Sequence, residues 1–121
     1  MEKAKSFEDL IVWQKSNRIT LEVYKITEKL PTSEKYNLVS QMRRASVSVQ
    51  SNIAEGFSKR GKKDKINFYN ISLSSLQELK NYFRLVKDLG YIRDSRDIID
   101  KIDEVGKLLN GLSNSIKMRK W

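Results

Sequence analysis

The chain has 121 residues, no cysteine and no histidine, and a formal net charge of +9 from 24 Lys/Arg against 15 Asp/Glu. This length predicts one domain with its own core. The missing residue types exclude disulfides, thiolate metal sites and the commonest general base, so we expect no enzymatic activity, no metal and no cofactor. No signal-peptide segment and no apolar run of roughly 20 residues is present, which predicts a cytoplasmic protein without membrane contact.

The positive charge is unevenly distributed along the chain. Residues 1–56 hold nine Lys/Arg against seven Asp/Glu, whereas residues 57–121 hold fifteen against eight. Such an excess favours polyanionic partners, RNA or DNA above all, although it can equally serve solubility. Charge does not distinguish RNA from DNA.

The first expected element is a helix from about Asp9, preceded by a polar N-terminal lead-in over residues 1–8. Its apolar stripe repeats in steps of four and three. The stripe comprises Val12, Ser16, Ile19, Val23, Ile26 and Leu30. Pro31 ends this helix, because proline cannot continue it and restricts the residue before it. Thr32 or Ser33 is then expected to cap the second helix.

The second helix carries the motif QMRRASVSVQSNIAEG, from Gln41 to Gly56. Its apolar stripe is Leu38, Met42, Ala45, Val49 and Ile53. The polar residues expected to form a structural network beside that stripe are Gln41, Arg44, Ser48, Asn52, Glu55 and, from the third helix, Glu78. A buried charge without a partner is costly, so Arg44 is expected to pair with Glu55 or Glu78, and its loss to destabilise the fold by about 2–4 kcal/mol. Gly56 is expected to stop the helix in the left-handed conformation.

The most cationic window follows, FSKRGKKDK over residues 57–65, and is expected to be a turn marked by Gly56 and Gly61. The candidate nucleic-acid contacts are Lys59, Arg60, Lys62, Lys63 and Lys65, together with Arg43 from the second helix. Lysines in such a turn can follow a phosphate backbone and release counterions. A merely solvated turn is the alternative for the window, and a structural role is the alternative for Arg43.

Two further helices complete an antiparallel up-down-up-down four-helix bundle, a single domain over residues 9–121. The third helix carries two apolar stripes and is expected to end at Gly90, and the fourth to begin at Asp94 or Ser95 and end in the tail 117–121. The stripe of the fourth helix is Ile98, Ile102, Val105, Leu109, Leu112 and Ile116. Because the first and third helices are apolar on more than one face, a second buried contact is expected, and therefore a homo-oligomer.

Two groups of polar and aromatic residues allow a functional and a structural interpretation. Ser48 and Asn52 lie one helical turn apart, but without histidine or a strained nucleophile turn they are expected to form interhelical hydrogen bonds and not a catalytic pair. Trp13 and the tyrosines lie at helical spacing and are expected in the core or an interface, and not as platforms on which bases stack.

The motif QMRRASVSVQSNIAEG, with FEDLIVWQKS near the start and FYNISLSSLQEL in the third helix, closely resembles a known family. These are the small four-helix-bundle proteins encoded within intervening sequences of bacterial 23S rRNA genes, also labelled S23 ribosomal protein. The resemblance extends from Phe7 to about Leu109. The recurrent positions of that family correspond to Leu10, Trp13, Gln41, Arg43, Arg44, Ala45, Ser48, Asn52, Ile53, Ala54, Glu55, Gly56, Phe68, Ser75, Glu78 and Leu79. One departure is Gln50, where the family usually has proline.

The family is also similar to the accessory variability determinant proteins of diversity-generating retroelements, which form basic pentamers that bind nucleic acid and a reverse transcriptase. The resemblance therefore implies a ring-shaped homopentamer. Together with the charge, it predicts a non-enzymatic accessory protein that binds structured RNA or a nucleic-acid–protein complex through a basic surface. The alternative is an oligomeric scaffold that binds another protein and has no physiological nucleic-acid partner.

Overall fold

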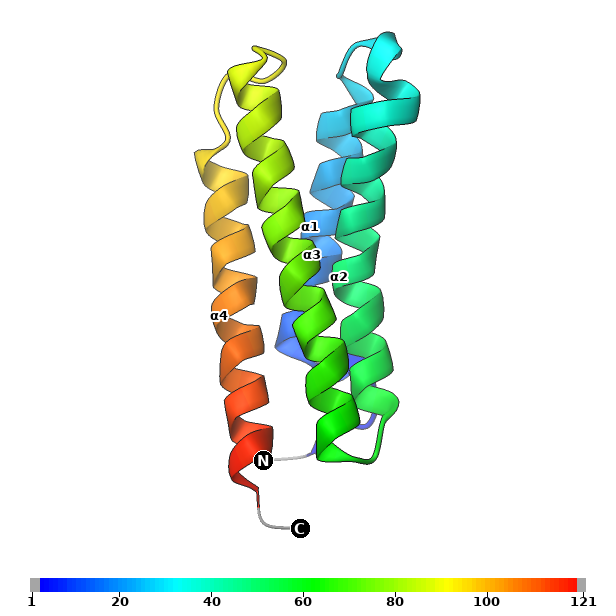
Figure 1. Cartoon of the computed structure of the whole chain (residues 1–121), viewed down its shortest axis with the longest axis vertical. Coiled ribbons are helices and arrows are strands. Elements are labelled where there is room, and N and C mark those ends of the chain that lie inside the picture. Colours follow the sequence, from blue (N-terminus) through cyan, green and yellow to red (C-terminus); the bar gives the residue numbers. More distant parts are fainter. Residues whose placement is uncertain (1–2, 120–121) are drawn as a thin grey trace.

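Four long α-helices account for most of the chain in the computed structural model, which describes residues 3–119. They are α1 (Ile11–Glu28), α2 (Ser40–Ser58), α3 (Lys62–Asp88) and α4 (Arg96–Met118). Successive helices run antiparallel, and α4 closes the bundle by packing against both α3 and α1 (Figure 1). The expected all-α four-helix bundle is confirmed. The first two residues of the lead-in and the last two of the tail lie outside the described residues.

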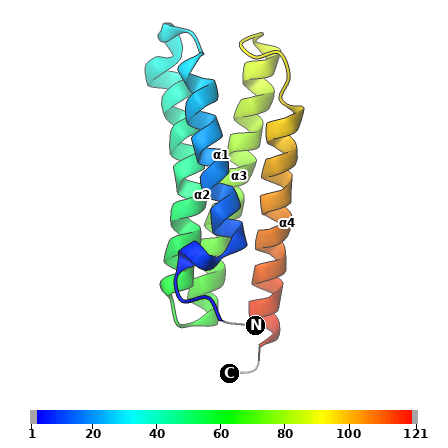
Figure 2. The same ribbon diagram turned by 180° about the vertical axis from the view of Figure 1, so that it is seen from behind.

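The even number of helices places both described chain ends at one end of the bundle, beside the turn from α2 to α3. Figure 2 shows the N-terminal segment, in dark blue, next to that turn. The α1–α2 and α3–α4 connections lie at the opposite end (Figure 1). At ~1.5 Å per residue, the 27 residues of α3 separate the two ends by about 40 Å.

The apolar stripes expected from periodicity form the core. The largest fully buried apolar side chains come from all four helices and include Val23, Met42, Ile53, Tyr69, Leu79, Phe83, Val86, Ile102, Val105, Leu109 and Ile116. Burying one such side chain stabilises a fold by about 1.5–3 kcal/mol, so these contacts supply the main favourable contribution. Ser16 replaces an apolar residue in the α1 stripe, and its hydroxyl donates to the carbonyl oxygen of Val12 (2.7 Å).

The end of α3 follows the sequence prediction. Gly90 has a φ of 80°, and no other described residue has a positive φ. Its N–H donates to the carbonyl of Lys87 (2.9 Å), and the N–H of Tyr91 donates to that of Val86 (2.9 Å). These two bonds form the Schellman motif, which satisfies carbonyl groups that the helix leaves without partners. Tyr91 and Ile92 then pack back against the core, as expected.

Gly56 has a different role from the one predicted. The residue is buried inside α2, which continues to Ser58, and it does not adopt the left-handed conformation. A Cβ atom at this position would lie 2.6 Å from Cε1 of Tyr69 and 3.2 Å from Cβ of Phe68. Glycine is therefore required for close approach of α2 to α3, and not for a helix stop.

The start of α2 also differs from the expectation. The chain first forms a 3-10 turn (Thr32–Glu34) and one π-helical turn (Lys35–Val39). The expected side-chain cap within the 3-10 turn is not formed. Glu34 instead accepts hydrogen bonds from the Tyr91 hydroxyl (2.8 Å) and from Asn37 Nδ2 (3.2 Å). This carboxylate therefore ties the two connections at this end to each other.

The lead-in is partly ordered by local contacts. Phe7–Asp9 forms a 3-10 turn, so α1 begins slightly later than predicted. Ser6 caps this turn by accepting a hydrogen bond from the N–H of Glu8 (3.1 Å). The ring of Phe7 lies edge-on to Trp13, with 5.0 Å between the centroids. The lead-in is thereby attached to the first turn of α1.

Candidate nucleic-acid interface

The cationic window over residues 57–65 is held by two helix ends. Helix α2 continues through Ser58 and α3 begins at Lys62, so only residues 59–61 connect them. The turn is therefore shorter than predicted, because Lys63 and Lys65 belong to the first turn of α3 and not to the connection. This arrangement fixes the positions of the cations more firmly than a loop would.

Two of these cations take part in the fold. The Lys65 ammonium donates to the last carbonyl groups of α2, the nearer being that of Phe57 (2.9 Å). It thereby caps the C-terminal end of α2, where the Gly56 carbonyl also accepts the N–H of Lys59 (3.2 Å). Burial, and secondarily the positive charge of Arg119, lower the pKa of Lys65. The Lys59 ammonium lies 5.2 Å from the ring centroid of Phe68, in cation–π geometry.

Two cations of the window, Arg60 and Lys63, are more available to a ligand. Arg60 and Lys63 are exposed, and neither side chain forms a hydrogen bond or an ion pair with another residue of the range 3–119. Lys62 is half-buried. A single carboxylate, Asp64, lies in the first turn of α3. The local excess of positive charge is therefore largely uncompensated.

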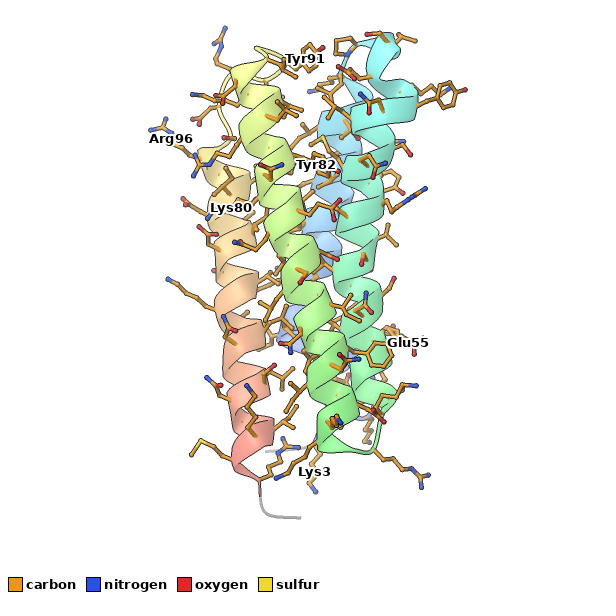
Figure 3. The ribbon with its side chains drawn as sticks, in the orientation of Figure 1. Lys3, Glu55, Lys80, Tyr82, Tyr91 and Arg96 are labelled. Carbon is orange, nitrogen blue, oxygen red and sulfur yellow. The ribbon has the colours of Figure 1, made fainter. Side chains whose placement is uncertain are left out.

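The fold adds cations from both chain ends to this cluster, which inspection of the window alone misses. Lys3, Lys65 and Arg119 line one cavity of about 700 Å³. Its other lining residues are mostly apolar: Ala4, Leu10, Phe57, Tyr69, Leu112 and Ile116. Lys117 lies in the last turn of α4 at the same end. Figure 3 shows Lys3 at this end and Tyr91 at the other.

We call this surface the basic end, defined by Lys3, Lys59, Arg60, Lys62, Lys63, Lys65, Lys117 and Arg119. The sequence signal that could have located it is the even number of helices, which brings both chain ends to the α2–α3 turn. Clustered ammonium and guanidinium groups bind phosphate oxygens without reading base identity. Convergence of charge from three parts of the chain also strengthens the local potential, which attracts polyanions.

Arg44 does not have the structural role expected for it, whereas Arg43 has the structural contacts that were its alternative. Arg44 is exposed and forms no ion pair with any described residue, so its predicted pairing with Glu55 or Glu78 is wrong. Arg43 is the half-buried member: its Nε donates to the hydroxyl of Thr27 (3.0 Å). At 3.6 residues per turn, two consecutive residues point about 100° apart, and the register of α2 turns Arg43 toward α1.

A polar network does run along α2, but it is built mainly from hydroxyl and amide groups. The Ser48 and Ser75 hydroxyls lie 2.8 Å apart across α2 and α3, and Asn52 Nδ2 donates to the Ser48 carbonyl (2.8 Å). Ser72 donates to the Val49 carbonyl (2.7 Å). Gln41 is half-buried and Glu55 is exposed, whereas Glu78 accepts a bond from the Tyr82 hydroxyl (3.1 Å). Charged residues of the predicted network therefore lie outside it.

Gln50, the position where proline is usual, is accommodated without a break in α2. Its Nε2 donates to Asn17 Oδ1 (3.1 Å), which adds a contact between α2 and α1.

Within residues 3–119, no group of three or more acidic side chains is arranged to hold a metal ion. No helix of that range is long and apolar enough to cross a membrane.

Comparison with known proteins agrees with this fold. A family model described as 23S rRNA-intervening sequence protein matches residues 8–111. A crystal structure of a protein of unknown function from the S23 ribosomal protein family of Bacteroides thetaiotaomicron VPI-5482 superposes with a TM-score of 0.79. The two chains are 24% identical, and the match covers 86% of this chain and 96% of that one. No match was found among curated proteins.

Proposed function

The chain belongs to the 23S rRNA-intervening sequence protein family, and we propose that it is a non-enzymatic, oligomeric accessory protein that binds nucleic acid through its basic end. The partner is structured RNA or a nucleic-acid–protein complex in the cytoplasm. The resemblance to the accessory variability determinant proteins supports the same class of function.

The observation that carries this proposal is the convergence of uncompensated cations at one end of the bundle. Arg60 and Lys63 are exposed there, and Lys3 and Arg119 join them from the chain ends. Lysine and arginine side chains that neutralise phosphates release the cations condensed on the nucleic acid, and this release favours binding. Helix α3 and the carbonyl-bound Lys65 keep the surface in place, so little ordering is needed on binding.

The test is charge reversal of the two unpartnered cations, Arg60→Glu with Lys63→Glu. Affinity for RNA and DNA, single-stranded and duplex, is measured at several salt concentrations. The control reverses two exposed cations elsewhere, Arg93→Glu with Lys107→Glu, so that both variants carry the same net charge. We expect the first variant alone to bind more weakly, with a slope of log affinity against log salt flatter by about 1–2. Equal losses of nucleic-acid affinity in both variants would mean that the basic end acts only through the net charge of the chain and is not a specific binding surface.

We also propose that the chain assembles with copies of itself, because α3 retains apolar side chains on its outer face. The resemblance to the pentameric accessory variability determinant proteins implies that the assembly is a homopentamer. Ile71, Leu85 and Leu89 are exposed, Leu89 by 49%, and Tyr82 beside them is half-buried. At 3.6 residues per turn these four positions fall within about 60° of one another, and the exposed Glu78, which accepts the Tyr82 hydrogen bond, lies in the same sector, between Ile71 and Tyr82 along the helix. An apolar stripe of this kind favours burial against another protein surface. Cyclic symmetry would then repeat the basic end once per subunit.

Light scattering tests the assembly. We expect the parent protein to have a mass near five times the 14.2 kDa of the chain. Ile71→Asp should shift it toward the monomer, whereas Asn70→Asp, which adds the same charge at an exposed position about 100° away, should not. A parent protein of 14.2 kDa at micromolar concentration would refute the oligomer.

The same exposed stripe favours the second candidate function, an oligomeric scaffold for another protein. The scaffold becomes the better proposal if the parent protein assembles but binds no nucleic acid even at low salt. Its positive charge would then serve solubility or an acidic protein partner.

A further inference from the structure

A second cationic surface lies where α1 ends and α2 begins, and along α2 its Arg43 is about 24 Å from Lys59 of the basic end at ~1.5 Å per residue. It is a shallow hollow of about 480 Å³. The hollow is lined by Tyr24, Lys35, Tyr36, Val39, Ser40, Arg43, Arg44 and Val47. We call it the Tyr–Arg hollow. All its charged groups are cations, and no acidic residue lines it.

Arg43 is held in position at one wall of the hollow. Its guanidinium carbon lies 4.5 Å from the ring centroid of Tyr24, which is cation–π geometry. Its Nε donates to Thr27 Oγ1 (3.0 Å) and one terminal nitrogen donates to the Tyr24 carbonyl (3.4 Å). Because these contacts fix the guanidinium before any ligand arrives, little side-chain entropy is lost when an anion binds it.

Tyr36 stands at the rim of the hollow and is 88% exposed, the most exposed of the large hydrophobic side chains in the described range. It belongs to the π-helical turn Lys35–Val39, a conformation that is rare and is found often at functional sites. The Lys35 ammonium lies 5.4 Å from its ring centroid. The outer ring face is thus an accessible aromatic surface next to cations.

Charge identifies the class of ligand. Tyrosine and arginine are also enriched where proteins contact one another, so aromatic character alone would fit a second copy of the chain. The three charged residues that line the hollow, Lys35, Arg43 and Arg44, are all cations, so the hollow attracts a ligand that is negatively charged along its length. A polyanion with planar apolar groups satisfies both features at once: phosphates neutralise the cations, and bases stack on the ring.

We propose that the Tyr–Arg hollow binds unpaired nucleotides of a nucleic-acid strand, with a base stacked on Tyr36 and the flanking phosphates on Arg43, Arg44 and Lys35. This inference rests on the proposed function and adds a preference to it. The basic end contacts phosphates of any nucleic acid, whereas the hollow requires a base that is free of its own stack. The protein therefore favours structured nucleic acid that carries a single-stranded segment or a loop.

The experiment compares Tyr36→Ala with Tyr36→Phe on three probes of equal length: a single-stranded RNA, an RNA duplex and an abasic strand that retains only the phosphate backbone. We expect Tyr36→Ala to weaken single-strand binding about 5- to 150-fold, which corresponds to the ~1–3 kcal/mol of one stacked base. Tyr36→Phe should retain parental affinity, because its ring still stacks. Affinity for the duplex and the abasic strand should be unchanged by either substitution.

Two results would refute the proposed binding of unpaired nucleotides in the hollow while leaving the proposed function intact. One is an equal loss on the single strand and the abasic strand, which would make Tyr36 irrelevant to stacking. The other is a fall in assembly mass for Tyr36→Ala with no loss of single-strand affinity at matched subunit concentration, which would make the hollow a contact between copies. A parent protein that binds none of the probes at low salt would instead refute the proposed function, and the hollow with it.

Discussion

Replacing Gly56 with alanine tests the reason for the close approach of α2 and α3. The new Cβ would lie 2.6 Å from Cε1 and 3.0 Å from Cδ1 of Tyr69, and 3.2 Å from Cβ of Phe68. Tyr69 is 2% exposed and cannot swing into solvent, and the Phe68 Cβ is fixed to the backbone of α3. Overpacking of this kind costs about 1–3 kcal/mol, and the better helix propensity of alanine offsets up to about 1 kcal/mol of it.

We therefore expect Gly56→Ala to lower the free energy of unfolding by about 1–2 kcal/mol. Gly111→Ala is the matched control, because a Cβ there meets no atom within 4 Å inside α4. The control should raise stability by about 0.5–1 kcal/mol. Chemical denaturation at several protein concentrations measures both values and separates folding from assembly.

Making Gly56→Ala in a Tyr69→Leu background completes a double-mutant cycle for this contact. Removal of the ring opens space beside position 56, so Gly56→Ala should become neutral or stabilising there. If Gly56→Ala raises stability as much as Gly111→Ala does in the parent protein, the packing explanation is wrong, and Gly56 must be explained by a role outside the fold of one chain.

Three further predictions concern individual side chains. Arg44→Ala should change stability by no more than about 0.5 kcal/mol, whereas Arg43→Ala should cost about 1–2 kcal/mol through its bond to Thr27 and its stacking on Tyr24; equal effects in denaturation would contradict the assignment. Burial raises the pKa of Tyr69 above 10.0, so stability present below that pH should decline as the pH rises further, an effect that Lys65, with its lowered pKa, opposes. Tyr69→Phe should reduce the decline without abolishing it, because the pKa values of Tyr82, Tyr91 and Lys101 are raised as well. The side chain and backbone N–H of Arg96 lower the pKa of Asp94 from 3.8 to about 2, so its contribution to stability is present above pH 3.8 and lost toward pH 2, and Asp94→Asn should flatten an acid titration of unfolding in that window.

Periodicity predicted the helices well because burial selects one face of each. The α4 stripe from Ile98 to Ile116 is buried as expected apart from the half-buried Leu112, and Gly90 ends α3 with the predicted geometry. Local rules failed where a distant residue decides the outcome. Gly56 was predicted to stop α2, yet its role depends on Tyr69 of α3, and sequence spacing carries no information about that contact.

The candidate site, like the fold, was predictable from the sequence only in part. The cationic window was visible in the sequence, because its residues are contiguous. The contributions of Lys3 and Arg119 to the basic end depend on how the chain folds back. That Arg43, and not Arg44, contacts α1 depends on the rotation of α2 about its axis. Consecutive residues of a helix point only about 100° apart. A stripe drawn from apolar spacing does not define the rotation of α2 closely enough to separate them.

The neighbouring positions of Lys3 and Arg119, which line one cavity, make the chain suitable for circular permutation. A short linker can join the two chain ends there, and the connection over residues 89–95, at the far end of the bundle, can be opened instead. An acidic fusion tag attached next to Lys3 or Arg119 would lie beside the basic end and compete with a polyanion for it. In the permuted protein the same tag would emerge about 40 Å away. A pair of such proteins would separate the effect of a tag from that of the protein surface in every binding measurement on this molecule.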